Sequence, residues 1–236
     1  MIKFFYSLSI FIVFNTNFFG QGSALQNLDV NSEYSSIDTY VNENIENGVI
    51  PGGVFLIANK GKVQYFKSFG FDNKILGKSY DNEAIFRIAS MTKNVTIVSI
   101  LQLMEKGKLK LDDPVSKYIP AFKETKVLEN FNPLDSSYTV VNQKKEISIR
   151  NLLTHTSGIY YGSFETDHLR AIYMKNDLMG FGLSNKEWTT EEMVNKIAAA
   201  PLAFQPGSAW KYGLNMEVLG RIIEVVSNTS LDLYFQ

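Results

Sequence analysis

The chain has 236 residues, of which 45% are apolar and 20% charged, a balance typical of a globular protein with a sizeable core. The 23 basic and 24 acidic residues give a net charge of −1, which excludes a strong global attraction to nucleic acid or to an anionic membrane. The absence of cysteine excludes disulfides, thiolate metal sites and a catalytic thiol. The two histidines, His155 and His168, form no His-Glu-x-x-His pattern, so we expect no metal cofactor.

The N-terminus has the features of a secretory signal peptide. Residues 3–14 carry one lysine and then a mostly apolar run, which polar residues at 15–17 end well short of the ~20 residues that span a bilayer. Small residues at 20–24 offer a cleavage site. A buried N-terminal strand is the alternative. We expect residues 1–22 to be removed and the mature chain to work in the periplasm or outside the cell, without a stable membrane anchor.

The residues that follow predict a helix and then a β-hairpin. Apolar side chains recur at close to helical spacing over residues 34–47, and Gly48 is a suitable stop. Two apolar segments, 54–58 and 63–66, flank a short polar turn at 59–62.

Helical patterns then dominate the chain. The segment from residue 90 to 104 becomes apolar on almost every side, which predicts a buried helix that Gly107 ends. Residues 111–114 predict a turn into a short helix that ends before Pro120. Residues 123–145 are polar and predict a surface loop.

Two more helices are expected towards the end of the chain. One covers residues 191–200, with Thr189 or Thr190 as its cap, and the other covers residues 216–226 after a turn at 205–208. The order helix, hairpin and then mostly helices predicts an α+β fold rather than alternating βαβ units.

A first candidate for chemistry is Ser90-Met91-Thr92-Lys93 at the start of the predicted buried helix. Residues three apart on a helix are neighbours, so the hydroxyl of Ser90 and the amine of Lys93 share one face. A serine needs a nearby base, and a lysine serves as that base when desolvation or positive charge lowers its pKa. A capping serine beside a solvated lysine is the structural alternative.

Two other motifs contain residues with catalytic potential. Residues 149–159 include His155 in Leu-Leu-Thr-His-Thr-Ser-Gly, where an isolated histidine invites interpretation as a general base. Residues 207–214 place Tyr212 after a Pro-Gly turn, where its phenol could face a pocket or its ring could fill a core.

Together these stretches resemble the serine β-lactamase and D-alanyl-D-alanine peptidase superfamily. The similarity is to the class C-like branch that includes the family VIII carboxylesterases, and it runs from about residue 30 to the end. The ordered segments that carry it are residues 50–52, 86–93, 152–158, 204–207 and 212–220.

The resemblance implies a β-lactamase/transpeptidase-like fold over residues 25–236, with an antiparallel sheet, flanking helices and an all-helical region. It implies that Ser90 is the acylated nucleophile, Lys93 its partner and Tyr212 the residue that shuttles the proton, with no cofactor. Leu-Leu-Thr-His-Thr-Ser-Gly corresponds to a structural signature of the family, so His155 is expected to be structural. No specific role is assigned to His168.

The chain departs from the family pattern after the tyrosine. Penicillin-recognising members usually have Tyr-x-Asn, whereas Leu214 stands here and Asn215 comes one position later. An amide at position 214 could donate to the carbonyl of a β-lactam or peptide, and a leucine cannot. The resemblance therefore favours the esterase-type branch.

A third family motif, on a later strand, is not found in the 24 residues after Tyr212. The ending at residues 231–236 resembles the middle of a family helix. We expect the chain to be truncated, without its C-terminal strands, and the 236 residues alone to be inactive.

These observations favour a serine hydrolase that acts on carboxylic esters through an acyl-enzyme. The alternatives are a β-lactamase or D-alanyl-D-alanine peptidase acting on β-lactams or D-amino-acid peptides, and a non-catalytic penicillin-binding or sensor homologue. The expected partner is a small ester, amide or β-lactam, and no nucleic acid.

Overall fold

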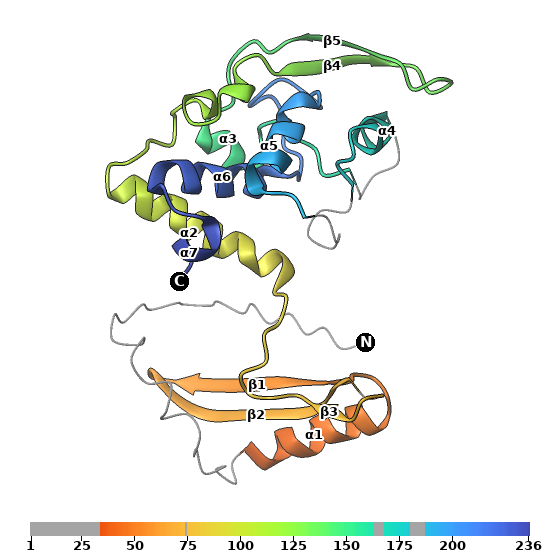
Figure 1. Ribbon diagram of the computed structural model, residues 1–236, viewed down its shortest axis with the longest axis vertical. Helices are drawn as coiled ribbons and strands as arrows, with labels where there is room; N and C mark the ends of the chain where they lie inside the picture. Colours follow the sequence, from red (N-terminus) through yellow and green to blue (C-terminus); the bar gives the residue numbers. More distant parts are fainter. Residues whose placement is uncertain (1–33, 74, 163–167, 180–186) are drawn as a thin grey trace, which may run out of the picture. The chain divides into compact units, whose positions relative to one another are not determined.

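The computed structural model describes residues 34–73, 75–162, 168–179 and 187–236 (Figure 1). The chain divides into two compact units, residues 1–87 and 88–236, each of which is described by itself below. The predicted signal peptide lies outside the described residues. Among the helices that are described, none combines the length and the apolar character needed to cross a membrane.

The first unit is a small antiparallel sheet with one helix on it (Figure 1). Its elements are α1 (Ser35–Glu46), β1 (Gly52–Asn59), β2 (Lys62–Asn73) and β3 (Lys78–Ser79), with sheet order β1-β2-β3. Lys60 and Gly61 join β1 to β2 with φ angles of 50° and 73°, as a tight two-residue hairpin requires. The predicted helix and hairpin are confirmed, and both strands are longer than the apolar pattern indicated.

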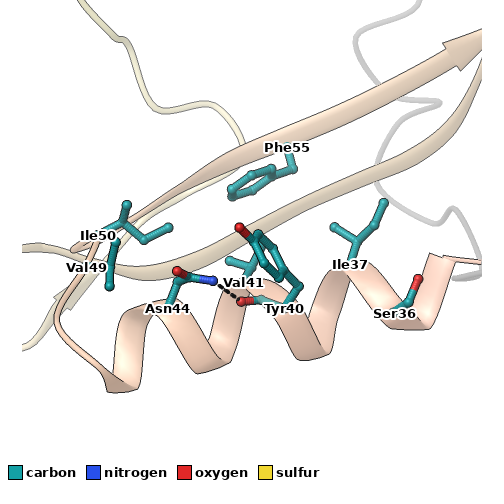
Figure 2. Close-up of a pocket in the computed structure, with 8 residues that line it drawn as sticks. All are labelled: Ser36, Ile37, Tyr40, Val41, Asn44, Val49, Ile50 and Phe55. Carbon is teal, nitrogen blue, oxygen red and sulfur yellow. Dashed lines mark hydrogen bonds between the residues drawn. The ribbon is translucent and has the colours of Figure 1, made fainter. Parts of the chain in front are cut away.

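A small apolar core joins α1 to the sheet. Val41, Tyr65 and Phe69 are buried there, and Asp38 on α1 accepts hydrogen bonds from the hydroxyl of Tyr65 and the amine of Lys67, both at 2.6 Å. Beside this core lies an open, mostly apolar groove, shown in Figure 2 and lined by Ser36, Ile37, Tyr40, Val41, Asn44, Val49, Ile50 and Phe55. Ser90, Lys93 and Tyr212 all belong to the other unit, so we do not assign the candidate chemistry to this groove.

The second unit is mainly helical (Figure 1). In chain order its elements are η3 (Ala89–Met91), α2 (Thr92–Glu105), η4 (Val115–Lys117), η5 (Pro120–Phe122), β4 (Lys126–Phe131), β5 (Tyr138–Asn142), α3 (Ile149–Leu153), α4 (His168–Lys175), α5 (Thr190–Ala199), α6 (Asn215–Ser227) and α7 (Leu231–Tyr234). The predicted helices at 191–200 and 216–226 correspond to α5 and α6. The short helix expected before Pro120 is the 3₁₀ turn η4.

The core of this unit is organised around α6. This helix packs against α2, α3, α5 and α7, and its apolar side chains Val218, Leu219, Ile222 and Ile223 are fully buried. Thr189 caps α5 by accepting a hydrogen bond from the Glu192 backbone, as the sequence suggested for Thr189 or Thr190. The fold therefore places the N-terminus of α6, which follows Tyr212, next to the helix that follows Ser90.

The prediction that α2 is buried on almost every side is wrong for the described chain. Ile100 and Leu103 are buried, but Val98 and Leu101 are 38% and 36% exposed. The reason is that α6 covers one face of α2, whereas apolar residues lie on both faces of α2.

The prediction of a surface loop over residues 123–145 is also wrong. The segment forms the antiparallel hairpin β4–β5, whose second strand is exposed throughout. Hydrogen bonds from Leu128 N to Leu202 O (2.9 Å) and from Leu202 N to Lys126 O (2.8 Å) hold β4 on the unit. The polar composition concealed the strands, because a strand that is exposed throughout, such as β5, lacks the alternation of apolar and polar residues typical of a half-buried strand.

Candidate active site

The structure brings the hydroxyl of Ser90 and the amine of Lys93 within hydrogen-bonding distance. Ser90 lies in the 3₁₀ turn η3, which continues directly into α2, and Lys93 lies in the first turn of that helix. Lys93 Nζ is 3.2 Å from Ser90 Oγ. A contact of this length is what a serine–base pair requires for proton transfer.

The turn that presents Ser90 is conformationally strained. Ala89 has a φ of 45°, in the left-handed region that residues with a Cβ rarely adopt. Such conformations cost of order 1–3 kcal/mol and cluster at functional sites. No sequence pattern predicts this feature, because alanine has no particular preference for left-handed turns.

Lys93 was expected to be desolvated, and in the structure it is only partly so. Lys93 is half-buried and Ser90 is exposed in the described chain. The reason is the same as for the apolar side chains of α2: the helix is covered on one side only.

Tyr212 lies beside the lysine. Lys93 Nζ is 5.5 Å from the centre of the Tyr212 ring. The ring of Tyr161 lies on Tyr212 at a centroid distance of 5.3 Å, so the phenol stands among aromatic side chains and next to the amine. The three residues predicted from the motifs are therefore assembled in one place: Ser90 contacts Lys93, and Lys93 contacts Tyr212.

The backbone around Tyr212 is fixed against residues 155–160. Lys211 N donates to His155 O at 2.9 Å, and Leu214 N donates to Tyr160 O at 3.3 Å. Gly213 approaches so closely that an added Cβ would lie 1.9 Å from the carbonyl oxygen of Ile159. A glycine is required at this position because only a residue without a side chain allows this approach.

His155 belongs to this bracing rather than to a free catalytic position. Its Nδ1 atom is 2.7 Å from Asn215 Nδ2 and accepts a hydrogen bond from Gly213 N at 3.3 Å. Its ring stacks on that of Tyr212, with centroids 4.9 Å apart and planes 29° apart. Burial, with the charge of Lys93 nearby, lowers the pKa of His155 and favours the neutral ring.

The structure places Leu214 and Asn215 in the core. Both side chains are fully buried, so Leu214 does not line a substrate pocket. Asn215 Oδ1 accepts from the hydroxyl of Ser157 at 2.5 Å, and its Nδ2 atom faces His155, so its amide is occupied inside the protein. The start of α6 at Asn215 explains this, because it turns both side chains towards the core.

Sequence reasoning missed Glu217 on α6. Its Oε2 atom is buried without a hydrogen-bond partner, and burial raises the pKa of this carboxyl although the charge of Lys93 opposes the shift. The available signal was a single acidic residue within the apolar run Met216-Glu217-Val218-Leu219. His168 begins α4, but its side chain lies outside the part that the structure describes. Among the described residues, no three His, Asp or Glu side chains are grouped as a metal site.

The fold is that of a known protein family. The family model "Beta-lactamase" matches residues 37–236, and the chain belongs to this family. Its relatives include proteins named as an esterase and as acyltransferases, and the solved structures that the chain resembles share the β-lactamase/transpeptidase fold.

Two curated relatives illustrate the range of activities. Esterase EstB of Burkholderia gladioli is 30% identical over 199 residues, which cover 84% of this chain and 46% of the esterase. The acyltransferase calJ of Penicillium decumbens is 32% identical over 177 residues, which cover 74% of this chain and 40% of the acyltransferase. The chain thus spans less than half the length of these relatives.

Solved structures show the same fold. EstCE1, described as a hydrolase with promiscuous acyltransferase activity, superposes with a TM-score of 0.70 at 29% identity over 85% of this chain and 49% of that one. Unliganded simvastatin synthase (LovD) from Aspergillus terreus superposes with a TM-score of 0.65 at 26% identity, covering 87% of this chain and 51% of that one.

Proposed function

We propose that the protein hydrolyses carboxylic esters through an acyl-enzyme formed on Ser90. The observation that carries this proposal is the 3.2 Å contact between Lys93 Nζ and Ser90 Oγ, with the same Nζ atom lying over the ring of Tyr212. This is the arrangement that turns an ordinary hydroxyl into a nucleophile, because the proton of Ser90 has an acceptor within reach.

In the first step, Ser90 Oγ forms a bond to the carbonyl carbon of the ester while its proton passes to Lys93. The carbonyl π electrons move to the oxygen, giving a tetrahedral oxyanion. When this collapses, the bond to the leaving oxygen breaks, and Tyr212 delivers a proton to that oxygen, taking the one held by Lys93 in return. The alcohol leaves and the acyl group stays on Ser90. Attack by water, with the same proton transfers reversed, releases the acid and regenerates the hydroxyl.

The position of Ser90 at the entrance to α2 supports stabilisation of the oxyanion. α2 has 14 residues, and the positive end of its dipole lies at the N-terminus beside Ser90. We assign the Ser90 backbone N–H as one donor to the oxyanion. Removing one such donor in other enzymes lowers the rate by about 10²–10³.

The choice of ester over β-lactam rests on what surrounds Tyr212. Leu214 and Asn215 are buried, so neither side chain is free to donate to the amide carbonyl beside a β-lactam ring. Sites that lack a required hydrogen-bond partner discriminate against the substrates that need it.

A second candidate is acyl transfer from the same intermediate. The chain is similar to proteins named as acyltransferases, and an acyl-enzyme on Ser90 can be attacked by an alcohol instead of water. The products then are a new ester and the free serine.

The experiment compares kcat/KM for short-chain p-nitrophenyl esters and for nitrocefin, using protein produced from its own gene, with Ser90→Ala as control. We expect esters to react much faster and Ser90→Ala to be at background. Comparable values for both substrates would contradict the ester preference. Turnover that survives in Ser90→Ala would contradict the whole mechanism.

We also propose that the protein is exported to the periplasm or the medium. The apolar run at residues 4–14 and the small residues at 20–24 support this. N-terminal sequencing of the natural protein should begin near residues 23–25. Retention of residues 1–22 in the natural protein would contradict export through a cleaved signal peptide.

A further inference from the structure

We propose that His155 is a positioning residue for Tyr212, holding the phenol where it can protonate the leaving group. This inference rests on the proposed function, because it assigns His155 a part in the step that Tyr212 performs. His155 touches Tyr212 in two ways: its ring stacks on the phenol ring at 4.9 Å, and its Nδ1 atom binds the backbone N–H of the next residue, Gly213.

The hydrogen bonds to His155 indicate which tautomer of its ring lies against Tyr212. Gly213 N–H and the Asn215 amide group both point at Nδ1, so this atom offers a lone pair and the ring carries its hydrogen on Nε2. A proton on Nδ1 would face two donors. The lowered pKa of His155 is consistent with the neutral ring that this geometry requires.

The histidine is in turn anchored in the core. Ile159 N donates to Ser157 Oγ at 3.0 Å, the Ser157 hydroxyl donates to Asn215 Oδ1 at 2.5 Å, and Asn215 Nδ2 faces His155 at 2.7 Å. Ser157 and Asn215 are fully buried, so the chain of bonds starts from an immobile part of the fold. Its last member, His155, stacks on the ring of Tyr212.

Histidine combines two properties that this position uses. Asparagine could supply the acceptor at the same distance from the backbone, and a phenyl ring could supply the stacking surface. Only an imidazole supplies both. His155 also has a φ of 54°, a left-handed conformation in which histidine and asparagine are enriched. His155→Asn therefore keeps the acceptor and the backbone but removes the ring from Tyr212.

The readout is the dependence of acylation on the leaving group. p-Nitrophenolate leaves without a proton, whereas the alkoxide of an ethyl ester must be protonated as it leaves. A displaced Tyr212 should therefore slow the ethyl ester much more than the p-nitrophenyl ester of the same acid. A role confined to stability would lower both rates equally, because fewer molecules would be folded.

The experiment measures kcat/KM for ethyl butyrate and p-nitrophenyl butyrate in protein produced from its own gene. Rates are normalised to the fraction of molecules that a fluorophosphonate labels, since fluoride also leaves without a proton. Tyr212→Phe is the reference and should change the ratio of the two rates by about 10². Ile197→Val, a cavity-forming change in the buried core of α5, is the control for lost stability.

We expect His155→Asn to change the ratio in the same direction as Tyr212→Phe, by about tenfold or more, since small displacements of a reacting group have effects of this size. Ile197→Val should leave the ratio unchanged. A His155→Asn ratio equal to wild type, with Tyr212→Phe shifted, would overturn the inference and leave the proposed function intact. Turnover that persists in Ser90→Ala would instead overturn the proposed function.

Discussion

A hydrogen bond of 3.2 Å joins Lys93 Nζ to Ser90 Oγ, and in the proposed mechanism the serine reacts only when this lysine takes its proton. We predict that Ser90→Ala, Lys93→Ala and the double variant share nearly the same residual esterase rate, because groups that act as one unit are not additive. The expected loss is on the order of 10³-fold or more, by comparison with the removal of other nucleophile–base pairs. Steady-state kinetics on a p-nitrophenyl ester measures it. Lys93→Ala retaining most of the turnover would show that Lys93 is not the base.

His155→Gln is expected to reduce stability while Ser90 remains reactive. The longer side chain moves its amide away from the position of Nδ1, so the bonds from Gly213 and Asn215 are lost, and glutamine is less favoured at a φ of 54°. The loss of such a buried bond costs roughly 1–3 kcal/mol. Thermal unfolding measures the stability. Fluorophosphonate labelling of the folded protein, in a separate experiment, measures the reactivity of Ser90. An unchanged melting temperature with abolished labelling would make His155 the base.

Motifs predicted Ser90, Lys93 and Tyr212 as site residues, and the structure brings the three together, but the motifs did not predict the orientation of their neighbours. Leu214 occupies the place of a family asparagine, and its burial follows from where α6 begins. Helix boundaries are set by tertiary packing to within one or two residues, so a pattern cannot fix them. The strain at Ala89 is invisible to sequence for a similar reason, since it depends on the turn that the rest of the fold imposes.

At the scale of elements, the segment before α6 contacts the segment after α3 through backbone hydrogen bonds and through a close approach at Gly213. We predict that Gly213→Ala is severely destabilising, because its Cβ would lie 1.9 Å from Ile159 O and the backbone must move. Strain of this kind costs about 1–3 kcal/mol or more. The shift should also displace Tyr212, so circular dichroism melting and ester turnover should both fall. Gly53→Ala is a matched control for inserting a methyl group, because Gly53 has no positive φ and its added Cβ would lie at an ordinary 3.5 Å from the Phe55 ring. Turnover in Gly213→Ala equal to that in Gly53→Ala would show that the close approach is not needed.

We predict that Glu217 makes the free energy of unfolding depend on pH. Its pKa is raised by burial, so the carboxyl is favoured in its neutral form when folded. A group whose folded pKa lies above its unfolded pKa contributes stability below the unfolded pKa and loses that contribution as the pH rises through the folded value. Glu217→Gln removes the titration. We therefore expect Glu217→Gln to gain stability over wild type as the pH rises from about 4, measured by urea unfolding at several pH values. A difference that is constant with pH would contradict the burial of this charge.

The strongest periodic patterns gave the right elements: α1, the β1–β2 hairpin, α5 and α6. The β4–β5 hairpin was missed because β5 is exposed throughout and β4 fully buries Val127 alone, so neither strand has a clear hydrophobic alternation. The burial of α2 was overestimated because an apolar helix surface shows that a partner is favourable, not that one is present. Local sequence patterns therefore predicted the helices and strands better than they predicted which faces of these elements are buried.

At the scale of the whole molecule, the resemblance to the β-lactamase family predicted the fold class correctly. It did so through several short segments that lie far apart in the chain and meet around Lys93, from residues 90–93, 155–157 and 212–215. Secondary-structure patterns alone reached only an α+β assignment. The family match covers residues 37–236, and the chain spans about half the length of the relatives named above.

The central claim is that the Ser90 hydroxyl is the reactive nucleophile, and one measurement tests it directly. The protein is incubated with a fluorophosphonate, digested, and mapped by mass spectrometry. We predict a single modified peptide with the label on Ser90, and no label in Ser90→Ala. A label on another residue, or labelling that persists in Ser90→Ala, would contradict the assignment of Ser90 as the nucleophile.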